Sequence, residues 1–253
     1  MTTYDDPVAM ARLVATYPLP MLIGLDVDGV LAPIVDHAHD ASLLAGMAVA
    51  VSTVAALDDV HVAVVSGRSL AGLEQFGFGD DVEVIGSHGM ETRDLALAPL
   101  TDGERTCLTC LDDAATRAAV RAGDGAWVER KPASVVLHVR QADQDTGPLA
   151  LADLAAEVDA VEGATTKAGS GVLEAFVRSA DKGTAMVELG ARLGVATTVF
   201  VGDDVTDEEA FARLGPDDVT IKVGDADTVA RHRIADPGAV LTFLQALAST
   251  TFA

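Results

Sequence analysis

Cysteine is scarce in this chain of 253 residues, in which only Cys107 and Cys110 occur. Two cysteines cannot form a disulfide framework, so a disulfide-stapled secreted scaffold is excluded and a reducing compartment is favoured. Their C-x-x-C spacing also lacks the second ligand pair of a structural zinc site and the preceding strand of a redox motif. We therefore interpret both cysteines as ordinary residues of a helix.

Basic residues are few as well, since 17 Lys and Arg stand against 39 Asp and Glu and give a formal charge of −22. Such a charge repels nucleic-acid backbones and anionic lipid surfaces, so we expect neither as a partner. Solubility or adaptation to salt is a simple alternative explanation of the acidic excess. A phosphate ester would also be repelled unless a metal ion and a few cations reversed the field locally, so a phosphate-binding role would require a divalent metal.

Long apolar runs are missing too. The most apolar stretch, residues 45–57, is interrupted by Ser52 and Thr53 and is shorter than the ~20 residues that span a bilayer. The N-terminal segment carries Asp5 and Asp6 and no basic region, so we expect no secretory signal. These features predict a cytoplasmic protein without a membrane partner, and we expect it to be a monomer.

Short apolar runs that end in Asp, Ser or Gly alternate with helical patterns along most of the chain. Runs of this kind predict strands that are buried on both faces of a parallel sheet. The predicted strands are residues 21–25, 62–65, 82–85, 198–201 and 219–223, and the predicted helices are residues 42–57, 70–76, 182–193, 207–214 and 239–247. The alternation predicts an α/β fold with a doubly wound, Rossmann-like parallel sheet, in which ligands bind beyond the carboxyl ends of the strands.

The middle of the chain breaks this alternation. Residues 127–140 alternate in the manner of an antiparallel hairpin, residues 149–161 predict a helix, and residues 172–178 predict another strand. We therefore expect a core of residues 1–103 and 180–253 with an inserted α+β cap domain, residues 104–179. Residues 101–104 and 179–181 would be its hinges. The insert is either a lid that closes on substrate or a purely architectural addition.

A pair of carboxylates follows the first predicted strand, in the sequence L-D-V-D-G-V of residues 25–30. Asp26 and Asp28 stand two residues apart on extended chain, so their side chains project to the same side. A hard divalent cation would remove their mutual repulsion, Asp26 could then attack phosphorus, and Asp28 could serve as general acid and base. Taken alone, the motif also fits a calcium loop or a simple turn.

Three later segments have the chemistry to complete such a site. Ser66 ends a strand and opens a helix, where its hydroxyl and nearby N–H groups can cradle phosphate or simply cap the helix. Lys182 opens another helix and is either a phosphate-balancing ammonium or a solvated side chain. The sequence G-D-D-V-T-D-E of residues 202–208 crowds four acids after a strand. That crowding favours a metal site over an acidic helix cap.

These four segments, in this order and at these boundaries, resemble the haloacid dehalogenase (HAD) superfamily of phosphohydrolases. The resemblance implies that Asp26 is the nucleophile and first metal ligand, and that Asp28 is the acid and base whose backbone carbonyl also binds Mg²⁺. It further implies that Ser66 and Lys182 hold the phosphoryl oxygens, that Asp203 binds the metal, and that Asp204 and Asp207 hold metal-bound water or orient their neighbours.

A finer resemblance points to the trehalose-6-phosphate phosphatases. The supporting segments include V-S-G-R from Val65, G-S-H-G-M-E from Gly86, E-R-K-P-A-S-V-V-L-H-V-R from Glu129 and V-L-E-A-F from Val172. Sugar hydroxyls need matching donors and acceptors. The residues implied to bind substrate are Arg68, His88 and Glu91 in the core and Glu129, Lys131, Arg140 and Glu174 in the cap. Cross-strand surface charge pairs are the alternative interpretation of the cap residues.

The resemblance therefore implies Mg²⁺-dependent hydrolysis of a small sugar phosphate, trehalose 6-phosphate, through an aspartyl-phosphate. Two alternatives stay open. The same machinery could act on sucrose 6-phosphate, mannosyl-3-phosphoglycerate or glucosylglycerol phosphate, which only cap residues would distinguish. A receiver-like module, in which the strand-end Asp is phosphorylated as a signal, is the other alternative, although Asp28 and the inserted domain argue against it.

Overall fold

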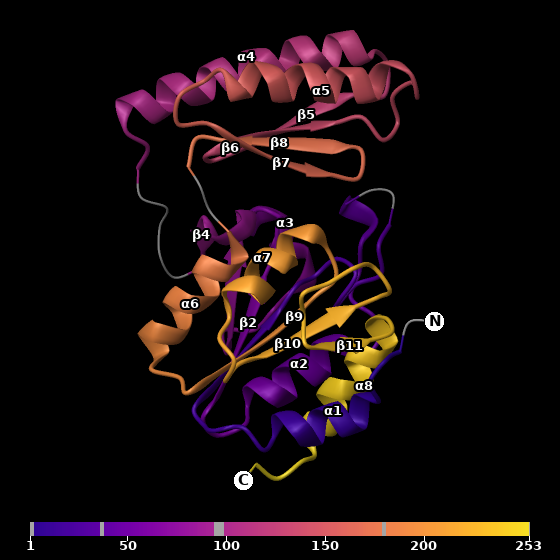
Figure 1. The fold of residues 1–253 in the computed structure, drawn as a ribbon, viewed down its shortest axis with the longest axis vertical. Coiled ribbons are helices and arrows are strands. Elements are labelled where there is room, and N and C mark those ends of the chain that lie inside the picture. Colours follow the sequence, from indigo (N-terminus) through magenta and orange to yellow (C-terminus); the bar gives the residue numbers. More distant parts are fainter. Residues whose placement is uncertain (1–2, 36–37, 94–98, 179–180, 253) are drawn as a thin grey trace. The chain divides into compact units, whose positions relative to one another are not determined.

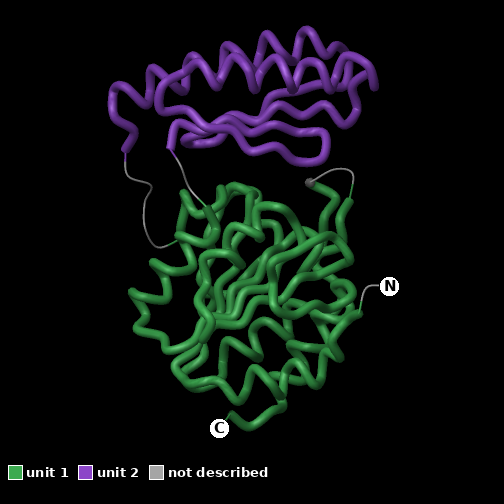
Figure 2. Tube along the Cα trace, in the orientation of Figure 1, with its two compact units in different colours: residues 1–97, 180–253 green, residues 98–179 purple. Residues whose placement is uncertain are grey.

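A computed structural model describes residues 3–35, 38–93, 99–178 and 181–252. The chain forms two compact units (Figure 2), one of residues Met1–Leu97 and Ala180–Ala253 and the other of residues Ala98–Ser179. The first unit is built around a mostly parallel sheet, and the second has an antiparallel sheet of its own (Figure 1).

The sheet of the first unit has the strand order β11-β10-β9-β1-β2-β3-β4 among the described residues. Strand β1 is central and pairs in parallel with β2 on one side and β9 on the other. Among the described strands of this sheet, β4 alone runs antiparallel, at the edge beside β3. The strands are β1 (Met21–Leu25), β2 (Val60–Val65), β3 (Val82–Gly86), β4 (Glu91–Thr92), β9 (Thr197–Gly202), β10 (Val219–Val223) and β11 (His232–Ile234).

Helices cover both faces of this sheet, so the doubly wound prediction is confirmed. Met21 and Ile23 of β1 belong to the apolar cluster that α1, α2 and α8 complete. Leu22, between them, belongs to the cluster of α6 and α7 on the opposite face. Each such fully buried side chain stabilises the fold by about 1.5–3 kcal/mol. The helices of this unit are α1 (Pro7–Val14), α2 (Met47–Ala55), α3 (Leu70–Leu73), α6 (Lys182–Leu193), α7 (Val205–Arg213) and α8 (Pro237–Ala248).

The second unit is an antiparallel sheet with two helices on one face. Its strand order is β5-β6-β8-β7. Arg130 of β5 forms an ion pair with Asp112 of α4 at 2.8 Å, which identifies the helix-covered face. Because side chains alternate along a strand, Glu129 and Lys131, on either side of Arg130, lie on the opposite face. The elements are α4 (Asp102–Ala122), β5 (Trp127–Lys131), β6 (Ser134–His138), α5 (Thr146–Asp159), β7 (Thr165–Gly169) and β8 (Val172–Phe176).

The structure corrects several predicted boundaries. Helix α2 begins at Met47 rather than at residue 42, because Gly46 before it has a φ of 90° that cannot continue a helix. Residues 101–104, which we predicted to be a hinge, form the N-terminal end of α4, where Thr101 caps the helix and forms a capping box with Glu104. Residues 179 and 180 of the other expected hinge lie outside the described residues, and Asp181 caps α6. Helix α1 and strands β4, β7 and β11 were not predicted.

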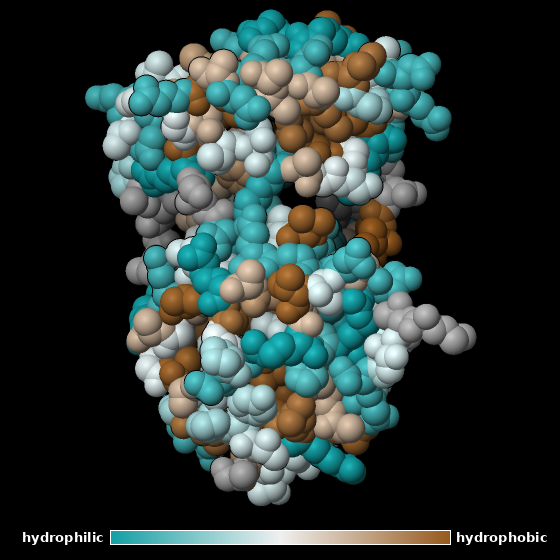
Figure 3. Space-filling model, in the orientation of Figure 1, coloured by the Kyte–Doolittle hydropathy of each residue, from teal (hydrophilic) through white to brown (hydrophobic). Residues whose placement is uncertain are grey.

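The face of the molecule drawn in Figure 3 is mixed in hydropathy. Figure 3 shows hydrophilic side chains over much of the drawn face, with hydrophobic ones in small groups between them. None of the helices in the described ranges combines the length and the hydropathy needed to cross a bilayer.

Glu104 of the α4 capping box also binds Arg178, which follows β8 at the end of the second unit. Arg178 donates from Nε to Glu104 Oε1 at 2.5 Å and from Nη2 to Glu104 Oε2 at 2.8 Å. Glu104 additionally accepts the backbone N–H of Thr101 at 2.7 Å. The hydrogen bond from Arg178, with those from Thr101, lowers the pKa of Glu104 from 4.5 to about 2.

Replacing Glu104 with Gln should lower the thermal midpoint at pH 7. Because the pKa of the folded state is depressed, the stabilisation is complete above pH 4.5 and is lost as the pH falls through about 2. The midpoints of wild type and Glu104→Gln, followed by circular dichroism, should therefore converge over that range. Asp102→Asn, which leaves this contact intact, is the control. A difference that stays constant down to pH 2 would contradict the prediction.

Candidate active site

Three sequence-predicted residues lie at the carboxyl ends of adjacent strands. Asp26 follows β1, Ser66 follows β2 and Asp203 follows β9. The register aligns the ends of these strands, since Leu25 lies opposite Val64 on one side and Val201 on the other. Strands β2 and β3 follow β1 on one side of it, and β9 and β10 lie on its other side. The strand order therefore reverses at β1. Ligands of doubly wound folds bind at such a point.

A cluster of three carboxylates lies at this end of the sheet. Ligand atoms of Asp26, Asp203 and Asp207 lie within 4.8 Å of one another. Burial raises the pKa of Asp26 well above its usual value, and the nearby Asp207 and Asp203 add to this against the opposing effect of Lys182. Burial, with Asp207, also raises the pKa of Asp203 to about 7. Ionisation of these carboxyl groups is therefore unfavourable in the metal-free site, and a further cation would relieve that cost.

Lys182 supplies a buried positive charge to this cluster. Its ammonium lies 2.9 Å from Asp26 Oδ2 and 2.8 Å from Asp207 Oδ1. Burial alone would lower the pKa of this side chain, but Asp207 and Asp26 reverse the effect and hold the pKa above its ordinary value. Lys182 is the first residue of α6, whose N-terminus is fixed by a hydrogen bond from the Thr184 N–H to Asp181 Oδ1 at 2.7 Å. The lysine is thus charged and held in place.

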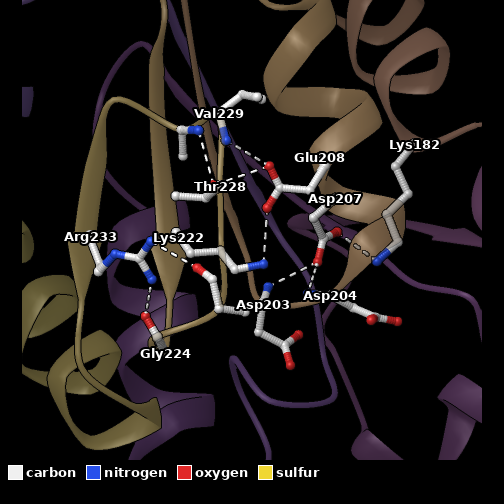
Figure 4. A network of polar contacts seen from close by, with 12 residues as sticks. Lys182, Asp203, Asp204, Asp207, Glu208, Lys222, Gly224, Thr228, Val229 and Arg233 are labelled. Atoms are coloured by element: carbon white, nitrogen blue, oxygen red, sulfur yellow. Dashed lines mark hydrogen bonds and ion pairs between the residues drawn. The ribbon is translucent and has the colours of Figure 1, made fainter. Parts of the chain in front are cut away.

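Asp207 fixes the acidic loop after β9 (Figure 4). Its Oδ1 contacts Lys182, while Oδ2 accepts the N–H groups of Asp203 and Asp204, each at 2.9 Å. Asp207 is fully buried, whereas Asp204 is exposed. Because both oxygens of Asp207 are engaged, this side chain orients the loop and the lysine rather than pointing a vacant oxygen at the centre of the cluster.

The donor set suits a hard divalent cation. Asp203 Oδ1 is buried and accepts no hydrogen bond from any described residue. Its partner oxygen lies against Gly29, where an added Cβ would come within 2.0 Å of Asp203 Oδ2, and the φ of Gly29 is +78°. A glycine is therefore required for the D-x-D-G turn to approach Asp203 this closely. Unfilled, closely spaced carboxylate oxygens are the ligands that Mg²⁺ and Ca²⁺ bind.

Asp28 is held by an arginine from the neighbouring strand end. Arg68 donates from Nε to Asp28 Oδ2 at 2.6 Å and from Nη2 to Asp28 Oδ1 at 2.7 Å. The guanidinium also lies 5.2 Å from the ring centroid of Phe76. This paired geometry is the strong form of an Arg–carboxylate contact. Sequence reasoning placed Arg68 among the substrate-binding residues and did not foresee its contact with Asp28.

The remaining core residues surround the loop after β2. Ser66 is buried, and its hydroxyl accepts the Arg68 N–H at 3.2 Å. An added Cβ on Gly67 would meet the His88 ring at 2.6 Å, so that ring lies directly against the loop backbone. Glu91 accepts the Ser87 hydroxyl at 2.5 Å and the Leu70 N–H at 3.3 Å. Glu91 therefore supports the loops of this region through contacts within the protein.

Three of the four predicted sugar-binding residues of the second unit, Glu129, Lys131 and Glu174, share one face of its sheet, whereas Arg140 follows β6 and lies outside the strands. Glu129, Val136 and Glu174 are direct cross-strand partners, so their side chains project to the same side, opposite α4 and α5. Glu174 is buried and accepts hydrogen bonds from Lys131 Nζ at 3.0 Å and Ser134 Oγ at 2.6 Å. Arg140 is exposed and donates to the Ser170 carbonyl at 2.7 Å.

A buried ion pair beside the acidic loop was missed at the sequence level. Lys222 of β10 lies 3.0 Å from Glu208 Oε1, and its side chain is 2% exposed. Glu208 also accepts the Thr228 hydroxyl at 3.1 Å and the Val229 N–H at 2.9 Å (Figure 4). A lysine inside the otherwise apolar run V-T-I-K-V was the available signal, because strands of a doubly covered sheet seldom carry an unpaired charge.

Sequence comparison extends over most of the chain. The family described as trehalose-phosphatase matches residues 24–237. A trehalose-phosphate phosphatase of Mycobacterium marinum is 32% identical over 251 residues, covering 92% of this chain and 63% of that protein. The trehalose-6-phosphate phosphatase of Escherichia coli is 30% identical over 233 residues, covering 87% and 84%.

Some relatives are far longer than this chain. It spans only 18% of the length of Mycobacterium tuberculosis proteins that are named uncharacterized glycosyl hydrolases and match at 33% identity over 246 residues. Among solved structures, the C-terminal domain of the Candida albicans trehalose-6-phosphate phosphatase matches with a TM-score of 0.82, at 21% identity and over 98% of both chains. At that identity, the structural match concerns the fold.

Replacing Asp207 with Asn should destabilise the metal-free protein by about 1–3 kcal/mol, because it removes one of the two buried carboxylate partners of Lys182 and weakens the contacts that hold the acidic loop. Urea unfolding of the wild type and the variant measures the difference. Asp204→Asn is the matched control, since Asn caps a helix as well as Asp and the position is exposed. Equal unfolding free energies for Asp207→Asn and wild type would show that the contact with Lys182 does not hold this loop.

Proposed function

The chain belongs to the trehalose-phosphatase family, and we propose that it hydrolyses trehalose 6-phosphate to trehalose and phosphate through an aspartyl-phosphate at Asp26. The proposal rests chiefly on the surroundings of Asp26 at the end of β1. Lys182 Nζ lies 2.9 Å from Asp26 Oδ2, and carboxylate oxygens of Asp203 and Asp207 lie close by. This arrangement supports a carboxylate nucleophile beside a positive charge that receives the phosphoryl group.

In the first step, an Asp26 oxygen attacks phosphorus and the bond to the sugar oxygen breaks. Asp28 donates a proton to the departing sugar oxygen, so trehalose leaves as a neutral alcohol. Lys182 and the Ser66 hydroxyl stabilise the charge on the phosphoryl oxygens. The other Asp26 oxygen, Oδ1, accepts the Val27 N–H at 2.7 Å, which fixes the orientation of the carboxylate for the attack.

In the second step, Asp28 removes a proton from water, whose oxygen attacks phosphorus and regenerates the Asp26 carboxylate. Asp28 must alternate between its charged and its protonated form for both steps. In the described structure, its two carboxylate oxygens are both occupied by Arg68, at 2.6 and 2.7 Å. We therefore assign to the substrate phosphate the role of drawing Arg68 away, which frees an Asp28 oxygen to reach the departing sugar oxygen and, later, the attacking water.

We assign Mg²⁺ to Asp26, Asp203 and the backbone carbonyl of Asp28. When bound, the ion would neutralise the clustered carboxylates and polarise the phosphoryl group for attack. The buried, unpartnered Asp203 Oδ1 supports this assignment. Asp207 and Asp204 would act from outside the ligand set, the former by holding the loop.

We assign recognition of the sugar to the polar face of the second unit. Glu129, Lys131 and Glu174 offer the carboxylate acceptors and ammonium donor that sugar hydroxyls require. Mutual contacts hold Lys131 and Glu174 in fixed positions, which reduces the entropy lost on binding a rigid disaccharide.

A panel of phosphate esters assayed with Mg²⁺ tests the proposed substrate. Trehalose 6-phosphate should have the highest kcat/KM among trehalose 6-phosphate, sucrose 6-phosphate, mannosyl-3-phosphoglycerate and glucosylglycerol phosphate. Preference for another ester would reassign the substrate and keep the chemistry, whereas release of no phosphate from any of them would reject the enzyme.

Asp26→Asn should lower kcat for trehalose 6-phosphate by at least about a thousandfold, since an amide cannot replace the carboxylate nucleophile. Folding should persist, because burial already disfavours charge at this position and Lys182 keeps Asp207 as its partner. Rapid-quench phosphate release measures kcat, and circular dichroism checks the fold. Wild-type turnover by the folded variant would refute the nucleophile.

Stabilisation by Mg²⁺ should grow with pH. Without metal, folded Asp203 keeps its proton up to about pH 7 while the unfolded chain releases it near 3.8, so the carboxyl destabilises the fold increasingly as the pH rises between these values. A bound cation removes that cost. The rise in thermal midpoint on adding Mg²⁺ should be larger at pH 8 than at pH 5, and Asp203→Asn should abolish the difference. Equal rises in the wild type at both pH values would count against the site.

A further inference from the structure

An aromatic stack lies on the polar sheet face of the second unit. The Trp127 and His138 rings are parallel, with centroids 3.9 Å apart and an interplanar angle of 1°. The two residues are direct cross-strand partners on β5 and β6. Trp127 is 51% exposed although it is a large hydrophobic residue. It is also the only tryptophan in the chain.

The stack is fixed in place by a carboxylate. His138 Nε2 lies 3.0 Å from Glu129 Oε2. The hydrogen bond with His138 lowers the pKa of Glu129, so its carboxylate is ionised and only accepts, and Nε2 carries the shared hydrogen. Glu129 thus sets the imidazole plane, and the imidazole plane sets that of the indole. Such preorganised aromatic surfaces bind ligands with little loss of side-chain entropy.

The surroundings of the stack are polar rather than apolar. Glu129 and Lys131 follow Trp127 on the same face of β5, and Glu174 is the cross-strand neighbour of Val136 beyond them. Among the described residues of this unit, the other exposed large hydrophobic side chains are Val120 and Leu149, and both lie on helices. A single exposed indole beside carboxylates and an ammonium is a poor surface for an apolar protein partner. It matches a sugar ring, which has a nonpolar C–H face and hydroxyls around its edge.

We propose that the Trp127–His138 stack binds the C–H face of a glucose ring of the disaccharide phosphate, while Glu129 accepts its hydroxyls. The inference rests on the proposed function and adds to it a specificity-determining aromatic residue. The indole contributes dispersion and desolvation, which discriminate ring sugars from acyclic phosphates, whereas the polar residues discriminate among hydroxyl patterns.

The sole tryptophan permits a direct binding test on the wild-type protein. Titration with trehalose should change the tryptophan emission in a saturable way, because the ring covers an exposed indole. Mannitol at the same concentrations, a polyol without a ring face, should leave the emission unchanged. This measurement needs no turnover, so its result is independent of whether trehalose 6-phosphate is hydrolysed.

Kinetics of variants provide the second measurement. Trp127→Leu should lower kcat/KM for trehalose 6-phosphate by about tenfold, the size of one aromatic contact. It should leave hydrolysis of acetyl phosphate, which has no sugar, within about twofold, and Trp127→Phe should restore much of the loss, because the ring and not the bulk is required. Val120→Ala, an exposed apolar residue on α4, is the matched control and should change neither rate.

A saturable emission change with trehalose, together with the selective loss in Trp127→Leu, would support the stack as a sugar platform. Emission unchanged at saturating trehalose, or a Leu variant with unchanged kcat/KM for a sugar phosphate that the protein hydrolyses, would overturn it. Emission that depends on protein concentration and not on sugar would also overturn it, since a second copy would then cover the ring. If trehalose changes the emission but trehalose 6-phosphate is not hydrolysed, the stack is supported and the proposed reaction fails.

Discussion

The contact of one buried ammonium with two buried carboxylates is the interaction on which the core site depends. Lys182 lies within 3 Å of both Asp26 and Asp207, in a protein whose formal charge is −22. Without that ammonium, the carboxylates at the strand ends would repel one another in a setting of low dielectric constant, where such repulsion is costly. With it, Asp207 is free to use its second oxygen for the backbone of the acidic loop, and Asp203 takes its place near Asp26.

Lys182 offsets the unfavourable burial of these carboxyl groups only in part. The pKa of Asp203 stays raised at about 7, and that of Asp26 also stays raised. One oxygen of Asp203 is buried without a hydrogen-bond donor among the described residues. A fold rarely retains such costs without a function, since buried polar groups are nearly always satisfied. The unfavourable ionisation of these carboxyl groups, with the unpartnered oxygen of Asp203, is the physical reason to expect a divalent cation there.

The second unit stabilises its polar groups by pairing them across strands. Its polar face holds polar groups in pairs, Lys131 with Glu174 and Glu129 with His138, so that few of them need water for stabilisation. The cross-strand register creates these pairs, because it sets side chains from β5, β6 and β8 side by side. The same register stacks Trp127 on His138. A face of fixed polar groups with one aromatic ring is suited to a polyhydroxylated ligand.

The sequence by itself determined the α/β sheet and the residues at its strand ends. Parallel strands covered on both faces must be continuous apolar runs, so Asp26, Ser66 and Asp203 stood out where those runs stop. Only the tertiary structure decided which polar groups touch. The contacts of Arg68 with Asp28, Lys222 with Glu208 and Trp127 with His138 join two loops, a strand and a helix, and two strands, respectively. Their geometry depends on register and helix placement. Neighbouring residues in the sequence are enough to predict periodicity and helix caps, as at Thr101 and Glu104. Side-chain contacts between segments that are distant in the sequence depend on how the whole core packs.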